Sequence, residues 1–283
     1  MPSLLIDDCE LAFDDSGPRR ATTLVLLHGF LGCKEDWQTI RAALDRRLRI
    51  VAMDLPGHGR TRAAHFPQHY SIDGICRLLD ALLERLGVRD AIVVGYSMGG
   101  RVALAYALHS QRPLRGLVLE SASAGLADPL QRRLRADEDQ QRAAALERHG
   151  LRTFIALWES QPLFATQAAL APSTRELQRD LRLRGDAREL AASLRAAGAG
   201  AQPWFGDRLA TLTLPVLLIC GALDPKFSTI AEQMFGVLPD ARRLCADGAG
   251  HNVHLEKPDW FASALGAFAD EIASNNDNQG VRP

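Results

Sequence analysis

Short apolar runs alternate with helix-like segments through the first 120 residues. Residues 22–27, 49–53, 91–94 and 114–119 are mostly apolar, which is typical of strands buried on both faces of a parallel sheet. Between them, residues 37–44 and 71–86 favour helices, and apolar positions recur every three or four residues in the second segment until Gly87 ends it. Residues 4–13 resemble an antiparallel edge hairpin. The pattern predicts an α/β fold with a mostly parallel, doubly wound sheet flanked by helices.

The alternation stops at residue 121 and resumes after residue 204. The intervening stretch is rich in Arg, Glu, Ala and Leu and contains no convincing strand. Because a connection of this length is rarely structureless in a compact domain, it predicts an inserted helical lid. Strands follow at 214–220 and 242–245, and a helix at 258–272. We therefore expect a core from 1–120 and 205–273, a lid over 121–204, and a disordered tail over 274–283.

Composition narrows the class of protein further. The chain has 283 residues, 47% of them hydrophobic, and a formal net charge of −1, so no basic surplus indicates a nucleic-acid or membrane partner. Neither a secretion signal nor an apolar run of bilayer length is visible. Five cysteines without a C-x-x-C pair predict reduced thiols in a cytoplasmic protein. Because lysine is rare, arginine supplies nearly all the positive charge of the chain. An arginine therefore indicates anion recognition only where its position in the sequence also favours that role.

The pentapeptide at residues 95–99, GYSMG, places Ser97 between a predicted buried strand and a predicted helix. Glycines on both sides permit a tight elbow that holds Ser97 Oγ at the end of the sheet. The backbone N–H of Met98 would then face an anion beside the serine. A Gly/Ser turn without chemistry is the alternative, because the pentapeptide alone also occurs by chance.

Two further residues come directly after predicted strands and complete a Ser–Asp–His order. Asp224 follows 214–220, where it could orient a histidine or merely cap the next helix. His251 lies in a glycine-containing loop after 242–245, and His254 is a less favoured base. The loop HGFLG at 28–32 offers the backbone N–H of Phe30 as a second oxyanion donor, although it could be a plain strand-to-helix turn. This is the order found in α/β hydrolases.

Such a triad supports two chemistries. His251 can remove the Ser97 proton so that the serine attacks a carbonyl, or the pair can act as a base that abstracts a substrate proton. In both cases the Phe30 and Met98 amides would stabilise a developing negative oxygen. The residues of the triad do not choose between acyl transfer and proton abstraction.

Five spaced motifs carry a narrower resemblance. They lie at 95–101 (GYSMGGR), 158–164 (WESQPLF), 194–203 (LRAAGAGAQP), 224–227 (DPKF) and 250–254 (GHNVH). In these segments the chain resembles the 2-succinyl-6-hydroxy-2,4-cyclohexadiene-1-carboxylate synthases of menaquinone and phylloquinone biosynthesis, within the α/β-hydrolase superfamily. The resemblance implies a cofactor-free and metal-free carbon–oxygen lyase. Such an enzyme eliminates pyruvate from 2-succinyl-5-enolpyruvyl-6-hydroxy-3-cyclohexene-1-carboxylate. The alternative is a serine hydrolase, either a carboxylesterase or a carbon–carbon bond hydrolase.

The resemblance also implies where the substrate binds. Its three carboxylates call for guanidinium groups, which can bind a carboxylate through two hydrogen bonds. Arg101 lies one helical turn after the serine. Arg135 matches better than Arg132 in the lid, and Arg182 is preferred to its rival Arg184. Tyr96 and Trp158 match pocket-lining aromatics, although either could be a core residue. Where relatives often have tyrosine and threonine, this chain has Glu159 and Ala199, and we expect Glu159 to face away or pair with an arginine.

Overall fold

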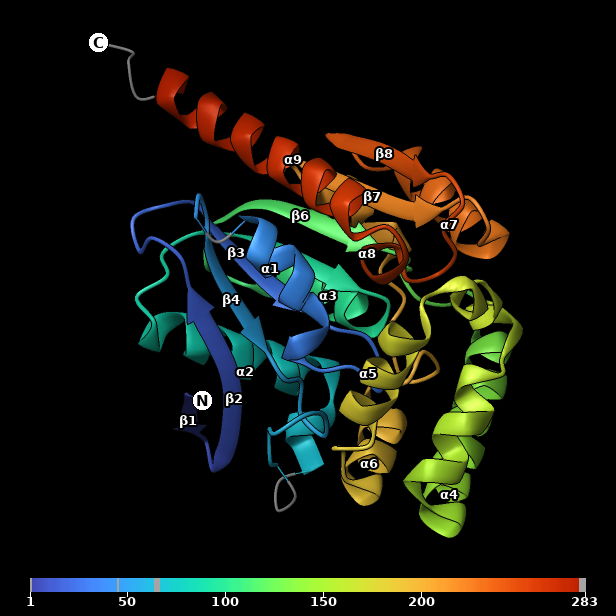
Figure 1. Ribbon diagram of the computed structural model, residues 1–283. Coiled ribbons are helices and arrows are strands. Elements are labelled where there is room, and N and C mark those ends of the chain that lie inside the picture. The colour runs from blue at the N-terminus through green and yellow to red at the C-terminus, as the bar shows by residue number, and fades with distance from the viewer. Residues whose placement is uncertain (1, 45, 64–66, 280–283) are drawn as a thin grey trace.

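A computed structural model describes residues 2–44, 46–63 and 67–279, with side chains described up to residue 274. Its eight strands form one sheet in the order β1-β2-β4-β3-β5-β6-β7-β8 (Figure 1). Strand β2 pairs antiparallel with both β1 and β4, and strands β3 to β8 run parallel. The strands are β1 (Ser3–Ile6), β2 (Cys9–Ser16), β3 (Thr23–Leu27), β4 (Arg49–Met53), β5 (Ala91–Tyr96), β6 (Leu114–Glu120), β7 (Val216–Gly221) and β8 (Ala241–Ala246).

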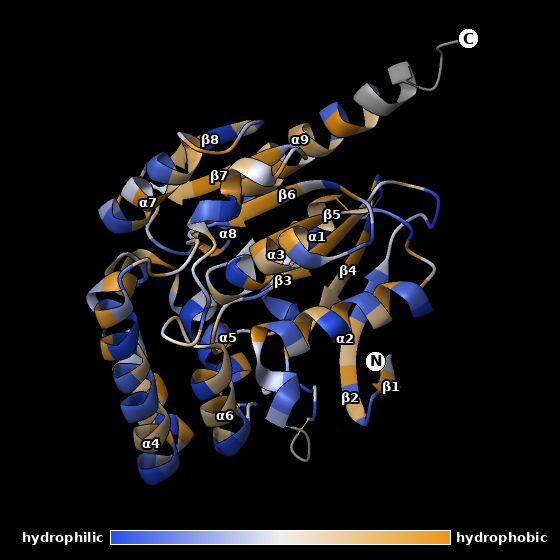
Figure 2. Ribbon diagram, turned by 180° about the vertical axis from the view of Figure 1, so that it is seen from behind, coloured by the Kyte–Doolittle hydropathy of each residue, from blue (hydrophilic) through white to orange (hydrophobic). Residues whose placement is uncertain are grey.

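The central strands are buried on both faces, as their continuous apolar sequence predicts. Figure 2 shows β5, β6 and β7 as hydrophobic ribbons beneath helices that are hydrophilic on their outer sides. The core helices and short 3-10 turns are η1 (Lys34–Trp37), α1 (Gln38–Leu44), η2 (Pro67–Tyr70), α2 (Ile72–Arg85), α3 (Met98–His109), α7 (Pro225–Phe235), α8 (Val253–Glu256) and α9 (Pro258–Gln279). One apolar cluster joins the sheet to α1 and α9, and another joins its other face to α2, α3 and α7.

Helices fill the long stretch between β6 and β7. They are α4 (Pro129–Glu159), η3 (Pro162–Ala169), α5 (Pro172–Arg182), α6 (Ala187–Ala197) and η4 (Gly206–Thr211), and the first four gather at one side of the sheet (Figure 1). Gly150 kinks α4 with φ 78°, a backbone conformation that glycine adopts without a steric penalty. The lid helices share an apolar cluster that includes Phe154, Ile155 and Leu194 and reaches Leu31 in the loop after β3. The lid is thereby packed against the edge of the sheet where Ser97 lies.

The last helix is longer than its apolar spacing predicts. We expected the helix to end at residue 272 and a disordered tail to begin at 274, but α9 runs to Gln279, and residues 280–283 lie outside the described part of the chain. A helix that is already packed against the core can continue for several residues without an apolar face. Each added residue forms one more backbone hydrogen bond, and only that residue has to be ordered. The helix thus extends beyond the end at residue 272 that the sequence predicts. No helix among the described residues has the length and apolar character needed to cross a membrane.

Candidate active site

The turn between β5 and α3 holds Ser97 in a strained conformation. Its backbone has φ 51° and ψ −107°, outside the regions that L-residues favour, which is typical of a nucleophile elbow. A Cβ on Gly99 would lie 2.2 Å from the carbonyl oxygen of Leu27, and one on Gly95 would lie 2.3 Å from that of Gly99. Only glycines allow helix α3 to start this close to strand β3. The elbow thus presents Ser97 at the carboxyl edge of the sheet.

Ser97, His251 and Asp224 lie in a hydrogen-bonded row. His251 Nε2 is 3.1 Å from Ser97 Oγ, and His251 Nδ1 is 2.7 Å from Asp224 Oδ2. The imidazole and the carboxylate are only 2% and 4% exposed, so water competes little for these bonds. In this arrangement Nδ1 donates to the carboxylate, which leaves Nε2 free to accept the serine proton. The described geometry is that of an activated hydroxyl.

Asp224 also caps the helix that follows it. Its Oδ1 accepts the backbone N–H of Phe227 at 3.1 Å, while Oδ2 faces the imidazole. The two interpretations of Asp224 from the sequence therefore hold together, because a carboxylate has two oxygens for two donors. The N-cap fixes the rotamer of the carboxylate, and the ring of Phe227 lies 4.5 Å from that of His251. Phe227 is thus a packing partner of the imidazole.

His254, the rival base, points elsewhere. Its Nδ1 lies 2.7 Å from Oε2 of Glu120, and its backbone N–H donates to Oε1 at 3.0 Å. The carboxylate of Glu120 is fully buried at the end of β6, and its backbone oxygen accepts the N–H of Ser97 at 2.8 Å. Glu120 therefore ties the loop of His251 to the strand beside the elbow. Sequence reasoning missed this residue, although an acid directly after an apolar strand was a visible signal.

The loop after β3 lies against the elbow. A Cβ on Gly29 would lie 2.7 Å from Cε1 of the Tyr96 ring, so a larger residue there would displace Tyr96, the neighbour of Ser97 in the elbow. Phe30 and Met98 line one cavity together with Ser97 and His251. Their backbone amides are our candidates for the oxyanion hole, since Met98 is the first residue of α3 and its N–H has no partner within the helix.

That cavity, which we call the Ser97 cavity, has a volume of about 170 Å³ and lies between the elbow and the lid. The predicted residues that line it are Phe30, Ser97, Met98, Arg101, Arg135, Trp158 and His251. Phe164 and Phe227 add aromatic walls, and Lys226 adds a cation that we had not assigned to the site. Lys226 and Phe227 lie inside the DPKF motif at 224–227, which was the signal available for them.

Two guanidinium groups face the Ser97 cavity. Arg101 Nη1 donates to the backbone oxygen of Ala197 at 2.8 Å, and Arg135 Nε donates to Asp139 Oδ1 at 2.8 Å. Each arginine keeps further N–H groups for a ligand. Burial and, to a smaller degree, the charge of Arg135 lower the pKa of Arg101 to about 10, while the charge of Asp139 acts in the opposite direction, so Arg101 is still protonated at neutral pH. Asp139 also lines the cavity and already pairs with Arg135, whereas the described partners of Arg101 are a backbone oxygen and an amide oxygen, so Arg101 is the cation better placed to attract a ligand carboxylate.

Arg182 lies apart from these two cations. It lines a smaller cavity of about 30 Å³ with Ser97, Tyr96 and Trp158, and Arg101 is not among the residues that line this cavity. Its Nη1 is 2.8 Å from Oε1 of Glu159. Glu159 thus pairs with an arginine, as we expected, and Arg179 binds its other oxygen. The structure brings Arg101 and Arg135 together and places Arg182 at a separate wall, with Tyr96 packed 5.4 Å from the His251 ring.

The remaining alternatives for the lid arginines lie outside both cavities. Neither Arg132 nor Arg184 is among the residues that line them, and Arg184 is exposed beyond the end of α5. Ala199, where relatives tend to have threonine, does line the Ser97 cavity. In each pair, the arginine that the sequence favoured is thus the one that lines a cavity: Arg135 and not Arg132, and Arg182 and not Arg184.

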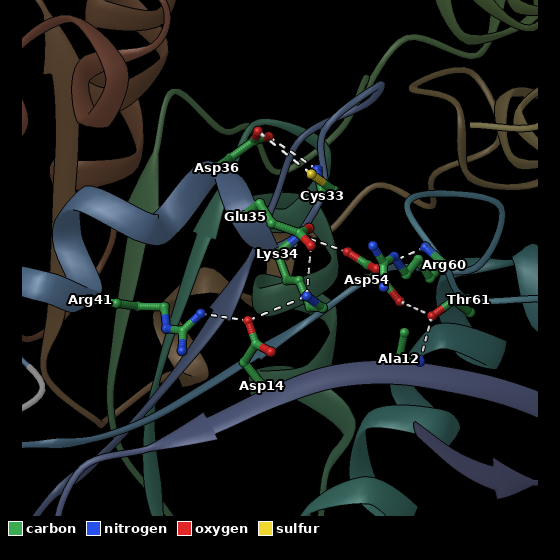
Figure 3. Close-up of polar contacts among 10 residues, drawn as sticks. All are labelled: Ala12, Asp14, Cys33, Lys34, Glu35, Asp36, Arg41, Asp54, Arg60 and Thr61. Carbon is green, nitrogen blue, oxygen red and sulfur yellow. Dashed lines mark hydrogen bonds and ion pairs between the residues drawn. The ribbon is translucent and has the colours of Figure 1, made fainter. Parts of the chain in front are cut away.

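A polar cluster beneath the loop after β3 fixes that loop in place (Figure 3). The carboxylate of Asp54 accepts the backbone N–H of Lys34 at 2.6 Å and that of Arg60 at 2.8 Å, so it joins two loops. The ammonium group of Lys34 is fully buried and pairs with Glu35 at 2.8 Å and Asp14 at 3.4 Å. Burial raises the pKa of Asp54 to about 6. The cluster holds the backbone that carries Phe30.

The same cluster contains three possible metal ligands. One donor atom each of Cys33, Glu35 and Asp54 lies within 4.8 Å of the others. Burial raises the pKa of the Cys33 thiol, which therefore stays protonated, whereas a metal binds the thiolate. The ammonium group of Lys34 already neutralises Glu35. These residues are suited to holding the two loops together through hydrogen bonds and ion pairs, and they are not suited to binding a metal ion.

Two buried histidines beside this loop make the stability of the fold depend on pH. Burial lowers the pKa of His28 to about 4 and that of His58 to about 3, so both are neutral in the folded chain. The unfolded chain takes up protons at these side chains below pH 6.5, and the folded chain does not. The contribution of these two histidines to the free energy of unfolding is thus fully present above pH 6.5, and it is lost as the pH falls. We expect His58 to account for about 2 kcal/mol of the loss between pH 7.5 and 5.0.

Urea midpoints of wild type and His58→Leu at these two pH values test this expectation. Leucine cannot be protonated, so the variant should lose less stability on acidification than wild type. His149→Gln, at an exposed position on α4, is the control and should follow wild type. Equal losses in wild type and His58→Leu would show that His58 does not act in this way.

Comparison with known proteins agrees with the fold. The family model of the alpha/beta hydrolase fold matches residues 22–258. With the strained serine elbow and the buried Asp–His pair, the chain is of the α/β-hydrolase class. A Serratia proteamaculans (strain 568) protein named 2-succinyl-6-hydroxy-2,4-cyclohexadiene-1-carboxylate synthase is 34% identical over 249 residues, 87% of this chain and 92% of that protein.

Two further similar proteins point to the same synthase family. A Bacillus subtilis (strain 168) protein, itself provisionally assigned to the same synthase, is 36% identical over 94% of this chain and 97% of its own length. The solved structure of MenH from S. aureus superposes with a TM-score of 0.89 at 31% identity, covering 93% of this chain and 98% of that one. The chain belongs to the 2-succinyl-6-hydroxy-2,4-cyclohexadiene-1-carboxylate synthase family.

Proposed function

We propose that this chain is a carbon–oxygen lyase that eliminates pyruvate from 2-succinyl-5-enolpyruvyl-6-hydroxy-3-cyclohexene-1-carboxylate. The product is 2-succinyl-6-hydroxy-2,4-cyclohexadiene-1-carboxylate, and no water is consumed. The observation that carries the proposal is the position of Arg101 and Arg135, which face the same cavity as Ser97 and His251. A tricarboxylate needs such cations, whereas an apolar ester gains little from them. Membership of the synthase family supports the same reaction.

In the proposed mechanism, Ser97 acts as a base. His251 Nε2 takes the serine proton, and Ser97 Oγ removes a proton from the substrate ring. The electron pair moves through the ring and breaks the bond to the enolpyruvyl oxygen. The departing enolpyruvate takes up the proton held by the His251 imidazolium and becomes pyruvate, which returns the triad to its starting state. Asp224 stabilises the imidazolium that forms, because Oδ2 of its carboxylate accepts a hydrogen bond from Nδ1–H, with 2.7 Å between Nδ1 and Oδ2.

The backbone and the arginines supply the remaining parts of the mechanism. The N–H groups of Phe30 and Met98 would stabilise the negative oxygen that develops on the substrate when the ring proton leaves. Arg101 and Arg135 would each bind a substrate carboxylate, and Arg182 would bind a third from the smaller cavity that it lines beside Ser97. We further propose that the enzyme is cytoplasmic and acts on this small molecule without a cofactor. Its five cysteines, all free thiols, are consistent with a reducing compartment.

Supplying the cyclohexene substrate and coupling pyruvate release to lactate dehydrogenase tests the proposal. We expect stoichiometric pyruvate from the wild-type chain. A serine hydrolase would instead turn over p-nitrophenyl esters and release no pyruvate. That second result would overturn the lyase assignment and leave the triad in place.

Replacing Arg101 with methionine is expected to raise KM for the substrate about 10- to 100-fold, because a charged hydrogen-bonded pair contributes roughly 1.5–3 kcal/mol. The effect on kcat should be smaller, since the carboxylate is bound in both ground and transition states. Arg101→Lys should restore only part of the affinity, because an ammonium group lacks the planar fork. Steady-state kinetics measure both parameters.

Arg133→Ala is the matched control for Arg101→Met. Arg133 is an exposed arginine of α4 that lines neither cavity, so its removal changes the net charge equally and should leave KM near the wild-type value. If both variants raise KM alike, the effect is one of overall charge, and Arg101 has no direct role in binding.

A further inference from the structure

Two linked ion pairs join the end of α4 to the end of α5 beside the active site. Glu159 is the last residue of α4, and Arg179 and Arg182 lie in the last turn of α5. Oε2 of Glu159 accepts from Nε and Nη2 of Arg179 at 3.0 and 2.5 Å, and Oε1 accepts from Nη1 of Arg182 at 2.8 Å. The side chains of Glu159 and Arg182 are only 18% and 12% exposed. Water and salt therefore screen their pair less than they screen a surface ion pair.

Glu159 binds Arg182 without lining the cavities that contain Ser97. Arg182 lines the cavity of about 30 Å³ beside Ser97, which we call the Arg182 cavity, and it also lines a cavity of about 370 Å³ together with Glu159. Glu159 is absent from the lining of both the Arg182 cavity and the Ser97 cavity. Nε and Nη2 of Arg182 donate to no residue that the structure describes. Glu159 thus uses one donor of the guanidinium group and leaves the others for a ligand.

The charge of Arg182 acts on the interior of the Arg182 cavity. Tyr96 and Asp36 line this cavity together with Ser97. Burial raises the pKa of both side chains, and the positive charge of Arg182 opposes the rise in each. Asp36 is the only acid in the lining, and its Oδ2 accepts the backbone N–H of Cys33 at 3.1 Å. Arg182 is therefore the group of this lining that attracts an anion.

We propose that Glu159 is a positioning residue for Arg182. Two hydrogen bonds from Arg179 fix the carboxylate, and the carboxylate fixes the guanidinium group so that its remaining N–H groups serve the Arg182 cavity. An arginine that is ordered before its ligand arrives binds a carboxylate more tightly, because fewer rotamers have to be frozen on binding. The inference rests on the proposed function, in which Arg182 binds the third carboxylate of the substrate.

A variant that removes the Glu159–Arg179 pair without changing the net charge tests the inference. Removing Glu159 alone would also take away a negative charge near the substrate, which by itself favours anion binding. Glu159→Met is therefore combined with Arg179→Met, so that one charge of each sign is lost. We expect KM for the substrate to rise about 3- to 10-fold and kcat to stay within about twofold, because Arg182 binds the carboxylate in both ground and transition states. Glu159→Gln with Arg179→Met keeps a neutral acceptor for Arg182 and should recover part of the loss.

Glu147→Met combined with Arg195→Met is the matched control. This exposed ion pair also joins two lid helices, α4 and α6, and neither residue lines a cavity that contains Ser97 or Arg182, so KM should stay within about twofold. In an Arg182→Met chain, the two methionines at 159 and 179 should add nothing further, because they act through Arg182. A rise in KM of the same size in that chain would show a merely structural role and overturn the inference. A lower KM in the Glu159→Met, Arg179→Met variant would identify Glu159 as an internal competitor for Arg182, and an unchanged KM would remove any role in binding.

Calorimetric binding to the Ser97→Ala chain separates this inference from the proposed function. That chain lacks the base and keeps Arg101, Arg135 and Arg182, so the Kd of the substrate is measured without turnover. We expect the Kd to rise about 3- to 10-fold when Glu159→Met and Arg179→Met are added. If wild type releases pyruvate but the Kd does not change, this inference alone fails. If wild type releases no pyruvate and the Ser97→Ala chain does not bind the substrate, the proposed function fails and the inference fails with it.

Discussion

Replacing Ser97 with alanine is expected to lower kcat for pyruvate release by about 10³- to 10⁴-fold, the range typical of losing a positioned base. Alanine keeps the Cβ and the strained backbone of the elbow but removes the hydroxyl that lies 3.1 Å from His251. The Ser97 cavity keeps Arg101 and Arg135, so substrate affinity should change little. The measurement is the coupled pyruvate assay under saturating substrate.

Two controls make the Ser97→Ala result specific. The melting temperature of the variant should stay at or above that of wild type, because the strain at φ 51° is not increased by a smaller side chain. Ser228→Ala, in α7, removes another hydroxyl near the triad, where Ser228 Oγ donates to the backbone oxygen of Gly221, and should keep most of the activity. If Ser97→Ala retains more than a tenth of wild-type kcat, the serine is not the base.

Replacing Glu120 with alanine is expected to destabilise the fold by about 3–5 kcal/mol, the usual cost of removing one partner from a buried pair. The change leaves both the Nδ1–H and the backbone N–H of His254 without an acceptor and opens a cavity at the end of β6. Because His254 follows His251 in the same loop, kcat should fall more than KM rises. Urea unfolding measures the stability, and steady-state kinetics measure the activity.

Two further variants bracket the Glu120→Ala result. Glu120→Gln keeps one oxygen acceptor and the side-chain volume, so it should lose less stability than alanine does. Glu147→Ala breaks an exposed ion pair with Arg195 and should change stability by no more than about 1 kcal/mol. A Glu120→Ala chain with wild-type stability would mean that the His254 loop is held by other contacts, such as the bond from Gly250 N–H to Glu256 at 2.7 Å.

Local pattern predicted most of the secondary structure, because burial on both faces of a parallel sheet requires continuous apolar residues. β4 has the bounds expected from the sequence, and α2 differs by one residue at each end. The end of α9 could not be predicted in this way, because its last residues continue the helix through backbone bonds without an apolar stripe. The kink at Gly150 was likewise missed, since a lone glycine inside a helical pattern also occurs in straight helices.

The site was predicted unevenly for a similar reason. Each triad residue follows directly on a strand, so the rule that parallel strands end at one edge sufficed to nominate all three. Glu120, Lys226 and Phe227 lie in segments that the sequence singles out, but only the contacts formed in the fold show what each side chain does. The many arginines of the lid look alike in sequence, and only packing distinguishes Arg135, which faces the Ser97 cavity, from its exposed neighbour Arg133.

The sequence by itself determined the order of strands and helices, the glycine-flanked elbow and the residue types of the triad, because backbone sterics and burial act over a few neighbouring positions. The tertiary structure decided the distances. Ser97 and His251 are 154 positions apart and meet at 3.1 Å only because β5 and β8 end at the same edge of one sheet. It also decided that Glu159 binds Arg182, since a charged side chain takes the nearest opposite charge that folding brings to it.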